Sequence, residues 1–180
     1  RGLGDVYKRQ IFHFQTMLRF DTYFWQAFRN TLVLSIVKLI LNTGAAVIIS
    51  LLLNEITNMA FKKSVQTIIY LPHFMSWVVV AAVFKMILSV NSSGVVNGAL
   101  INMGLIDNPI DFLGSSKYWT GTFFMMNVWK DTGWGTILFL ATLSGISPDL
   151  YEAAQIDGAN RFKRLIYITL PALANTCLLY

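Results

Sequence analysis

The chain has 180 residues, of which 55% are hydrophobic and only 13% are charged, and its mean hydropathy is +0.55. Soluble domains carry roughly 25% charged residues, so this composition excludes an ordinary soluble protein. The net charge is +5, but the basic residues are scattered, which argues against a surface that binds nucleic acid. We therefore predict an all-α integral membrane protein that contacts the lipid bilayer.

The first ten residues differ in composition from the rest of the chain. Four of residues 1–10 are charged, against 13% of the whole chain. We interpret residues 1–10 as a junction segment that is foreign to the fold. We expect residues 11–180 to form a partial transmembrane domain that is incomplete at both ends.

The first predicted span covers residues 31–53, in which the only charged residue is Lys38. A helix of this length is about 34 Å long, enough to cross a hydrocarbon core of ~30 Å. An aromatic group that includes Trp25 and Phe28 precedes the span, as is typical of a membrane interface.

Two further spans are predicted at residues 64–90 and 118–144, and a fourth, at residues 171–180, is truncated. Pro72 lies about two turns into the second span. Because proline removes one backbone hydrogen bond, we expect a kink there that neighbouring groups or water compensate. Residues 91–117 are rich in glycine and asparagine, which favour turns, and they separate the second span from the third.

The basic residues of the loops predict the orientation of the chain. Segments 54–63 and 145–169 together contain five lysines and arginines, whereas the loop between the second and third spans contains only Lys117. Cytoplasmic loops carry the excess of basic residues, which places the first and third loops in the cytoplasm. Arg19 and Arg29 would then lie outside, against this rule.

The third loop, residues 145–170, carries signals for two short helices. Ser147 is a favoured N-cap, and Pro148 suits the first helical position, where its missing N–H has no intrahelical partner. Gly158 can adopt the left-handed conformation that ends a helix, and Asn160 can cap a second, basic helix.

One face of the first loop helix carries small residues. Leu150, Ala153, Ala154 and Asp157 recur at helical spacing, and the alanines would let the backbone of another protein approach closely. The alternative is an amphipathic helix that rests on the membrane surface.

The order of residues in this loop resembles the coupling loop of ABC-importer permeases, in which a Glu-Ala-Ala run is followed by a glycine and then by Leu-Pro. The matching residues are Glu152, Ala153, Ala154, Gly158, Leu170 and Pro171. In that family the loop docks on a separate ATPase subunit and passes its motion into the membrane.

Before the first span, Phe28-Arg29-Asn30-Thr31 resembles the entry to the permease core of the same family. Three other segments are similar to its carbohydrate branch, and most of all to permeases for oligosaccharides and complex sugars. They are Leu52-Leu53-Asn54-Glu55, Tyr70-Leu71-Pro72 with Trp77, and Trp129-Lys130 with Gly133-Trp134-Gly135.

The resemblance implies a type I importer permease, a polytopic helical bundle in the bacterial cell membrane with its coupling loop in the cytoplasm. It also implies three kinds of protein partner: ABC ATPase subunits, a second permease subunit that is identical or similar, and an extracytoplasmic solute-binding protein.

A polar stripe runs along the third span. Asn127, Lys130, Asp131 and Trp134 follow helical spacing, and charges at this depth usually face protein or a water-filled cavity. One interpretation is a substrate path, in which Trp134 or Trp129 stacks on a sugar ring. The other is that Lys130 and Asp131 only satisfy each other or a neighbouring helix.

Signals of other functions are weak or missing. The sequence has no glycine-rich phosphate loop, and the spacing of His13, His73 and Cys177 indicates no metal site, so we predict no cofactor and no enzymatic activity. Two alternatives remain. One is an ion-coupled carrier or channel, which has no use for a docking loop. The other is an intramembrane enzyme built on Asp131 with Lys130 or His73, which lacks a second carboxylate or nucleophile.

Overall fold

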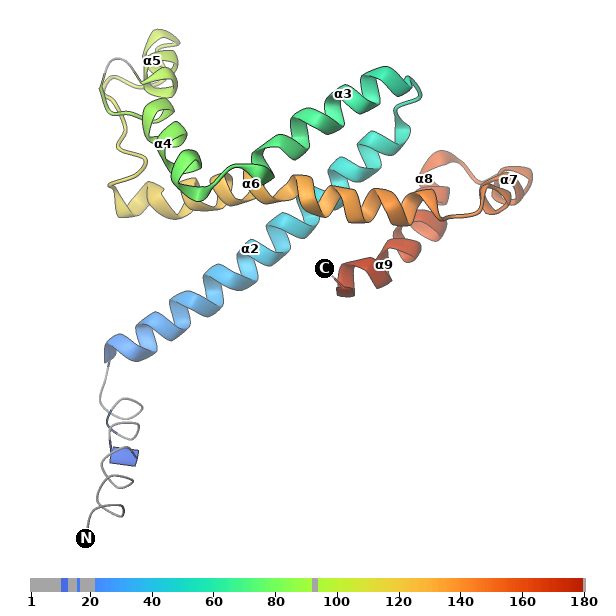
Figure 1. Ribbon diagram of the computed structural model, residues 1–180, viewed down its shortest axis with the longest axis horizontal. Helices are drawn as coiled ribbons and strands as arrows, with labels where there is room; N and C mark the ends of the chain where they lie inside the picture. The colour runs from blue at the N-terminus through green and yellow to red at the C-terminus, as the bar shows by residue number, and fades with distance from the viewer. Residues whose placement is uncertain (1–10, 13–15, 17–21, 92–93, 180) are drawn as a thin grey trace. The chain divides into compact units, whose positions relative to one another are not determined.

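The structure of the protein is a computed structural model, and it describes residues 11–12, 16, 22–91 and 94–179 (Figure 1). Within these residues the regular structure is helical and there is no strand, which confirms the all-α prediction. The chain divides into two units, residues 1–39 and 40–180, and each is described by itself. The junction proposed for residues 1–10 lies outside the described residues.

Helix α2 (Thr22–Glu55) is longer than the span expected at residues 31–53. Its first turns contain the aromatic group, in which Phe24, Trp25 and Phe28 pack on one another with ring centroids 5.5 to 6.1 Å apart. No glycine or proline interrupts these turns, so the helix continues through them. Among the described helices, α2 is the one that is long and apolar enough by itself to cross a membrane.

Helix α6 (Ser116–Ser144) is the central element of the second unit, and α3, the 3₁₀ turn η1 and α9 all contact it (Figure 1). It matches the helix expected at residues 118–144. Two apolar clusters hold its neighbours in place. The first joins α6 to the end of α2 and to α9 through Ala46, Leu53, Phe139, Leu140, Leu143 and Leu173. The second joins α4 to the following loop and to α6 through Val80, Phe84, Leu88, Phe112, Leu113 and Met126.

The second predicted span is not one kinked helix. It consists of α3 (Met59–Tyr70), η1 (Leu71–Phe74) and α4 (Trp77–Ile87), and the axes on the two sides of the break differ by 106°. The expectation of a single helix over residues 64–90 was therefore wrong. Only when α3 and α4 are taken together are they long and apolar enough to cross a membrane.

The sharp bend has a local cause beyond Pro72. Met75 and Ser76 are both extended, with ψ angles of 141° and 151°, so the chain leaves the helical conformation for two residues. Ser76 then starts α4 as its N-cap, and its hydroxyl accepts a hydrogen bond from the backbone N–H of Val79 at 3.3 Å. Proline alone would have left a kinked but continuous helix.

The loop between α4 and α6 is folded around one asparagine. Helix α5 (Val95–Asn102) carries Asn97, which has no exposed surface. The Asn97 amide donates to the carbonyls of Ser89 and Ile110 at 2.9 and 3.0 Å, and it accepts from the N–H of Ile110 at 2.9 Å. These three bonds hold the loop together, because they join Ser89 near its start and Ile110 near its end to α5.

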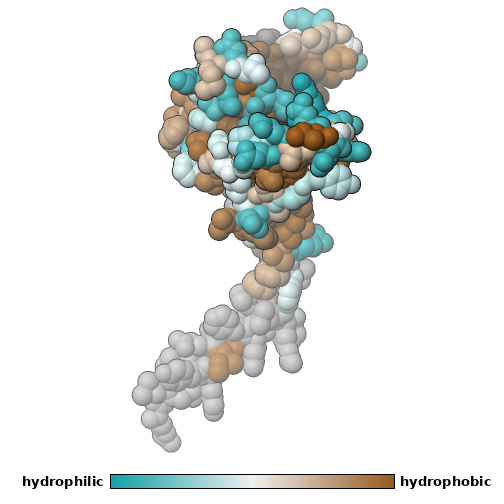
Figure 2. All heavy atoms as spheres, turned by 90° about the vertical axis from the view of Figure 1, so that its right-hand side faces the viewer, coloured by the Kyte–Doolittle hydropathy of each residue, from teal (hydrophilic) through white to brown (hydrophobic). Residues whose placement is uncertain are grey.

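The C-terminal part contains α7 (Pro148–Ile156), α8 (Arg161–Arg164), the π-helical turn η2 (Leu165–Thr169) and α9 (Leu170–Leu179). Figure 2 views the second unit from the side that carries α7, where hydrophilic side chains are mixed with hydrophobic ones.

Helix continues from residue 161 to residue 179, so the fourth apolar segment is already helical ten residues before residue 171, its expected start. The π turn explains how Pro171 is accommodated. The N–H of Leu170 bonds to the carbonyl of Leu165, five residues back, so the wider turn precedes the residue that has no N–H.

Helices α6 and α3 approach each other closely at Gly133. A Cβ at this position would lie 2.5 Å from the carbonyl oxygen of Ile69 and 3.0 Å from the Cα of Tyr70. We expect Gly133→Ala to push the two helices apart and to lower the free energy of unfolding by ~1–3 kcal/mol. Thermal unfolding of the detergent-solubilised protein measures this loss.

Gly121 on the same helix is the matched control, because a Cβ there would meet nothing within 4 Å. Gly121→Ala should leave stability unchanged or raise it by up to ~1 kcal/mol through better helix propensity. Equal stability of the two variants would contradict the close approach at Gly133.

Candidate functional site

Helix α7 starts as its sequence predicts. Ser147 is the N-cap, and its hydroxyl accepts from the N–H of Asp149 at 3.3 Å. Pro148 occupies the first turn, and Asp149 adds negative charge there, which stabilises the N-terminal end of the helix dipole.

The turn after α7 is a Schellman motif centred on Gly158. Gly158 has a φ of +75°, and its N–H bonds to the carbonyl of Gln155 at 3.1 Å. The N–H of Ala159 bonds to the carbonyl of Ala154 at 2.8 Å, which completes the motif. Asn160 then caps α8 by accepting from the N–H of Lys163 at 2.9 Å. The predicted glycine stop and asparagine cap are both confirmed.

The predicted face of α7 is largely open to solvent. Leu150 is 55% exposed, Ala153 and Asp157 are exposed, and only Ala154 is half-buried. Glu152 is exposed as well. Such a surface, with short side chains and an open helical backbone, can be contacted closely by another protein.

The structure adds two apolar side chains to this surface that helical spacing had not indicated. Ile156 is 87% exposed at the end of α7, and Phe162 is 67% exposed on α8. We use the name loop surface for Leu150, Glu152, Ala153, Ile156, Asp157 and Phe162. Leu170 and Pro171, by contrast, lie inside the continuous helix that follows the loop.

A hydroxyl pair connects α7 to the helix that follows. The Tyr151 hydroxyl lies 3.0 Å from the Thr169 hydroxyl, and Thr169 is only 6% exposed. The Thr169 hydroxyl also reaches the carbonyl of Arg164 at 3.4 Å, across the π turn. The two partners are 18 residues apart, so no spacing rule would have paired them.

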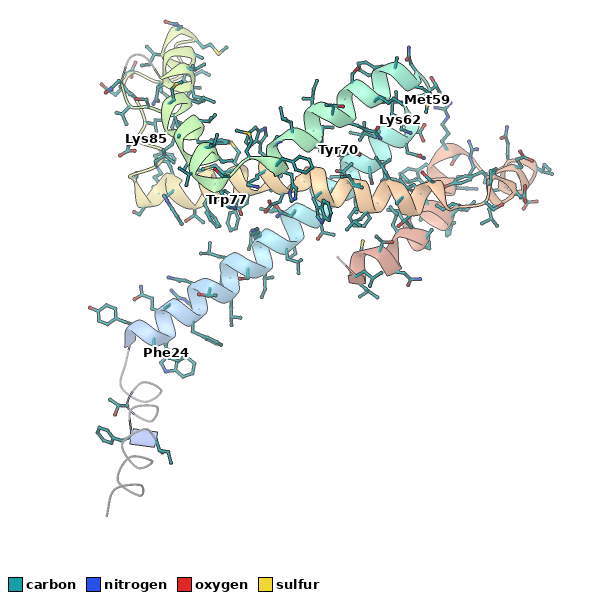
Figure 3. The ribbon with its side chains drawn as sticks, in the orientation of Figure 1. Phe24, Met59, Lys62, Tyr70, Trp77 and Lys85 are labelled. Carbon is teal, nitrogen blue, oxygen red and sulfur yellow. The ribbon has the colours of Figure 1, made fainter. Side chains whose placement is uncertain are left out.

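Lys130, from the predicted stripe, lies against the break between η1 and α4. In a continuous helix the His73 carbonyl would accept from the N–H of Trp77, but the extended residues prevent this. Lys130 Nζ donates to that carbonyl instead, at 2.8 Å, and lies 5.4 Å from the centre of the Trp77 ring. Trp77 lies at the corner where the chain turns into α4 (Figure 3).

Trp134 lies at the same break. Its ring stacks on the His73 imidazole with centroids 5.3 Å apart and an angle of 15° between the planes, and 48% of its surface remains exposed. His73 Nδ1 is buried and has no hydrogen-bond partner among the described residues. Trp134 therefore combines a fixed ring orientation with an accessible aromatic surface.

The other stripe residues have different surroundings. Asn127 is only 2% exposed, and its amide donates to the carbonyl of Phe123 on its own helix at 2.8 Å. Trp129 is directed at α4, where its ring meets Phe84 edge-on at 5.4 Å. Asp131 is half-buried. The structure thus brings Lys130 and Trp134 together at the break, while Asn127 and Trp129 contact other parts of the unit.

Comparison with known proteins places this geometry in a family. The sequence model described as "Binding-protein-dependent transport system inner membrane component" matches residues 42–179. Protein LplB of Bacillus subtilis is 42% identical over 153 residues, which cover 85% of this chain and 47% of the relative. The polygalacturonan/rhamnogalacturonan transport system permease protein YteP of the same organism is 38% identical over 89% of this chain and 49% of the relative.

A solved structure has the same fold. The crystal structure of a bacterial ABC transporter involved in the import of the acidic polysaccharide alginate superposes with a TM-score of 0.85 at 38% identity, covering 93% of this chain and 57% of that one. The present chain spans about half the length of the curated relatives it matches. On the extent of the family match and the identity to these relatives, the chain belongs to the binding-protein-dependent transport system inner membrane components.

Proposed function

We propose that the chain is part of a multi-pass permease subunit of an ATP-driven, binding-protein-dependent importer of sugars or oligosaccharides in the bacterial cell membrane. One observation carries this proposal: the α7–Gly158–α8 loop has a defined left-handed turn and exposed small and apolar side chains within a segment that matches the family. The names of the relatives support the substrate class, because they include permeases of transport systems for polygalacturonan/rhamnogalacturonan, lactose and arabinooligosaccharides.

We propose residues 11–180 as the permease domain, with residues 1–10 as a junction and residues 145–170 as the coupling loop. The membrane-crossing parts are α2, the bent α3–α4 pair, α6 and the helix that contains α9. The composition of α2 supports its assignment as a membrane-crossing helix, and so does that of the bent pair when its two helices are taken together. The assignment of α6 is supported by its hydrogen bonds, since Thr122, Asn127 and Thr136 each donate to a carbonyl four residues back. Polar groups satisfied within the helix are compatible with a bilayer.

In this proposal the loop surface docks on a separate ATPase subunit, which hydrolyses ATP. Leu150, Ile156 and Phe162 would supply apolar anchors, and Ala153 and Ala154 would allow close approach of the partner's backbone. The Schellman turn fixes the angle between α7 and α8, and the Tyr151–Thr169 pair connects α7 to the membrane helix. A second permease subunit, identical or similar, and an extracytoplasmic solute-binding protein complete the proposed importer. A solved alginate transporter in complex with an oligosaccharide-bound periplasmic protein supports the latter partner.

The docking role is tested by two substitutions at Gly158. Valine is strained at a φ of +75°, whereas asparagine tolerates the left-handed region. A strain of about 1–2 kcal/mol should make Gly158→Val recover the ATPase about tenfold less well and lose uptake, while Gly158→Asn stays near wild type. The measurements are co-purification of the ATPase and sugar uptake at matched permease abundance. Wild-type coupling in Gly158→Val would refute the docking role.

The orientation is tested by cysteine labelling in a Cys177→Ser background. Asn108 and Asn160 are both exposed and lie on opposite sides of α6 in the sequence. Because the basic residues place residues 145–169 in the cytoplasm, Asn108→Cys should react with an impermeant thiol reagent in intact cells and Asn160→Cys only after permeabilisation. Labelling of Asn160→Cys in intact cells would reverse the topology and remove the docking loop from the side where ATP is.

We also propose that Trp134, presented by His73 beside Lys130, contacts the sugar along the substrate path, to which Asn127, Trp129 and Asp131 contribute as lining. Transporters commonly bind substrate near the middle of the membrane, where helices are broken. Trp134→Ala should lower uptake or change sugar preference while abundance and ATPase recovery are kept. Trp119→Ala is the control, since Trp119 is similarly exposed on α6 but stacks on Phe123. A loss of abundance that accounts for the loss of uptake would make Trp134 a packing residue.

A further inference from the structure

A groove of about 690 Å³ lies within the second unit, between the end of α2 and the loop, and it shares Phe162 with the loop surface and Tyr151 and Thr169 with the hydroxyl pair. The end of α2 forms one wall, and Tyr151 of α7 together with α8 and η2 forms the other. The lining residues used below are Ile48, Leu51, Leu52, Glu55, Arg161 and Arg164.

The groove is apolar at one end and polar at the other. Leu51 and Leu52 lie one turn after Ile48 on α2, and Ile48 and Leu52 are 59% and 64% exposed. Asn54 and Glu55 come next after Leu53 and end the helix. A molecule bound in the groove would therefore meet apolar side chains at one end and polar side chains a few ångströms further along α2. An amphiphile at a membrane surface has this pattern.

Arg164 supplies an unused hydrogen-bond donor. Its Nε atom is buried and has no partner among the described residues. A buried donor without an acceptor costs about 1–3 kcal/mol, and more when the group is charged, so an acceptor that reaches the Arg164 guanidinium by a small shift of this side chain would be favoured. The planar fork of a guanidinium matches a phosphate group with two parallel hydrogen bonds.

The charges of the lining favour an anion. Arg161 and Arg164 contribute two positive charges and Glu55 contributes one negative charge, a net charge of +1. Glu55 is exposed at the end of α2, where water screens its repulsion of an anion, whereas the Arg164 Nε is shielded from water.

We propose that this groove binds an anionic phospholipid of the cytoplasmic leaflet. The phosphodiester would accept from Arg164 and Arg161, and the upper part of one acyl chain would cover Ile48 and Leu52. The proposal uses the orientation given under Proposed function, in which the end of α2 lies at the cytoplasmic membrane surface. Basic pockets between helices on that side are typical sites for acidic lipid headgroups, and the volume is that of a ligand site.

The test uses the intact permease with its ATPase in nanodiscs that contain equal parts of phosphatidylglycerol and phosphatidylcholine. After transfer to mild detergent, native mass spectrometry counts the lipids that each complex retains. We expect wild type to retain phosphatidylglycerol selectively. Arg164→Gln should weaken this retention about tenfold, since it removes a charged hydrogen-bond donor from the headgroup site.

Lys163→Gln is the matched control, because it makes the same charge change on the same helix at an exposed residue outside the groove. It should retain the lipid as wild type does. Leu52→Trp is a second test that keeps every charge and fills the apolar wall, and it should also reduce retention. Thermal unfolding of each variant shows whether it is folded.

Three results would overturn the proposal. Equal loss in Arg164→Gln and Lys163→Gln would indicate a general attraction to the membrane surface. Displacement of the lipid by inorganic phosphate would indicate a site for free phosphate. A crosslink from Leu52→Cys to another protein subunit, without lipid, would make the groove a protein interface. Uptake and ATPase recovery, measured in the same preparations, test the proposed importer, whereas lipid retention tests the groove. A failure of the lipid proposal can therefore be distinguished from a failure of the proposed function.

Discussion

The hydrogen bond from Lys130 to the carbonyl of His73 holds the central part of the second unit together. The bend of 106° between α3 and α4 removes the normal partner of that carbonyl, and a buried carbonyl without a partner costs about 1–3 kcal/mol. Lys130, on a different helix, donates a hydrogen bond to this carbonyl in place of the missing N–H. The buried charge of Lys130 gains an acceptor in the same bond, and it lies beside the aromatic ring of Trp77. One interaction thus stabilises both the broken helix and the buried charge of Lys130, and it joins the α3–α4 corner to α6.

The same requirement for satisfied polar groups shapes the rest of the unit. Thr122, Asn127 and Thr136 each bond to a carbonyl of α6 itself, and the Thr142 hydroxyl also meets that of Thr176 on α9, while a glycine at position 133 lets α3 pack closely. In the C-terminal helix the missing N–H of Pro171 is accommodated by a π turn, and the helix remains continuous. Movement of α8 would therefore be carried directly into α9, and the Tyr151–Thr169 pair would add α7 to the same rigid path.

Much of this protein follows from local sequence. The shortage of charge and the apolar blocks determined that the chain belongs in a membrane, because too few polar groups are available to cover a soluble surface. The caps at Ser147 and Asn160 and the left-handed turn at Gly158 were predictable for a different reason. Each depends on the backbone preferences and side-chain reach of residues within three or four positions, and these are the same in any fold. The order of residues in the loop was sufficient to indicate the family.

Only the tertiary structure decided which distant groups meet. Lys130 and His73 are 57 residues apart, and the sequence left open whether Lys130 lines a substrate path or only satisfies Asp131 or a neighbouring helix. The size of the bend depended on two extended residues, Met75 and Ser76, and Pro72 by itself indicated only a kink. The groove around Arg164 combines residues from α2, α7 and η2 that share no periodicity. Helical spacing identifies a face of a helix, but the rotation and neighbours of that face are set by close packing of the whole unit.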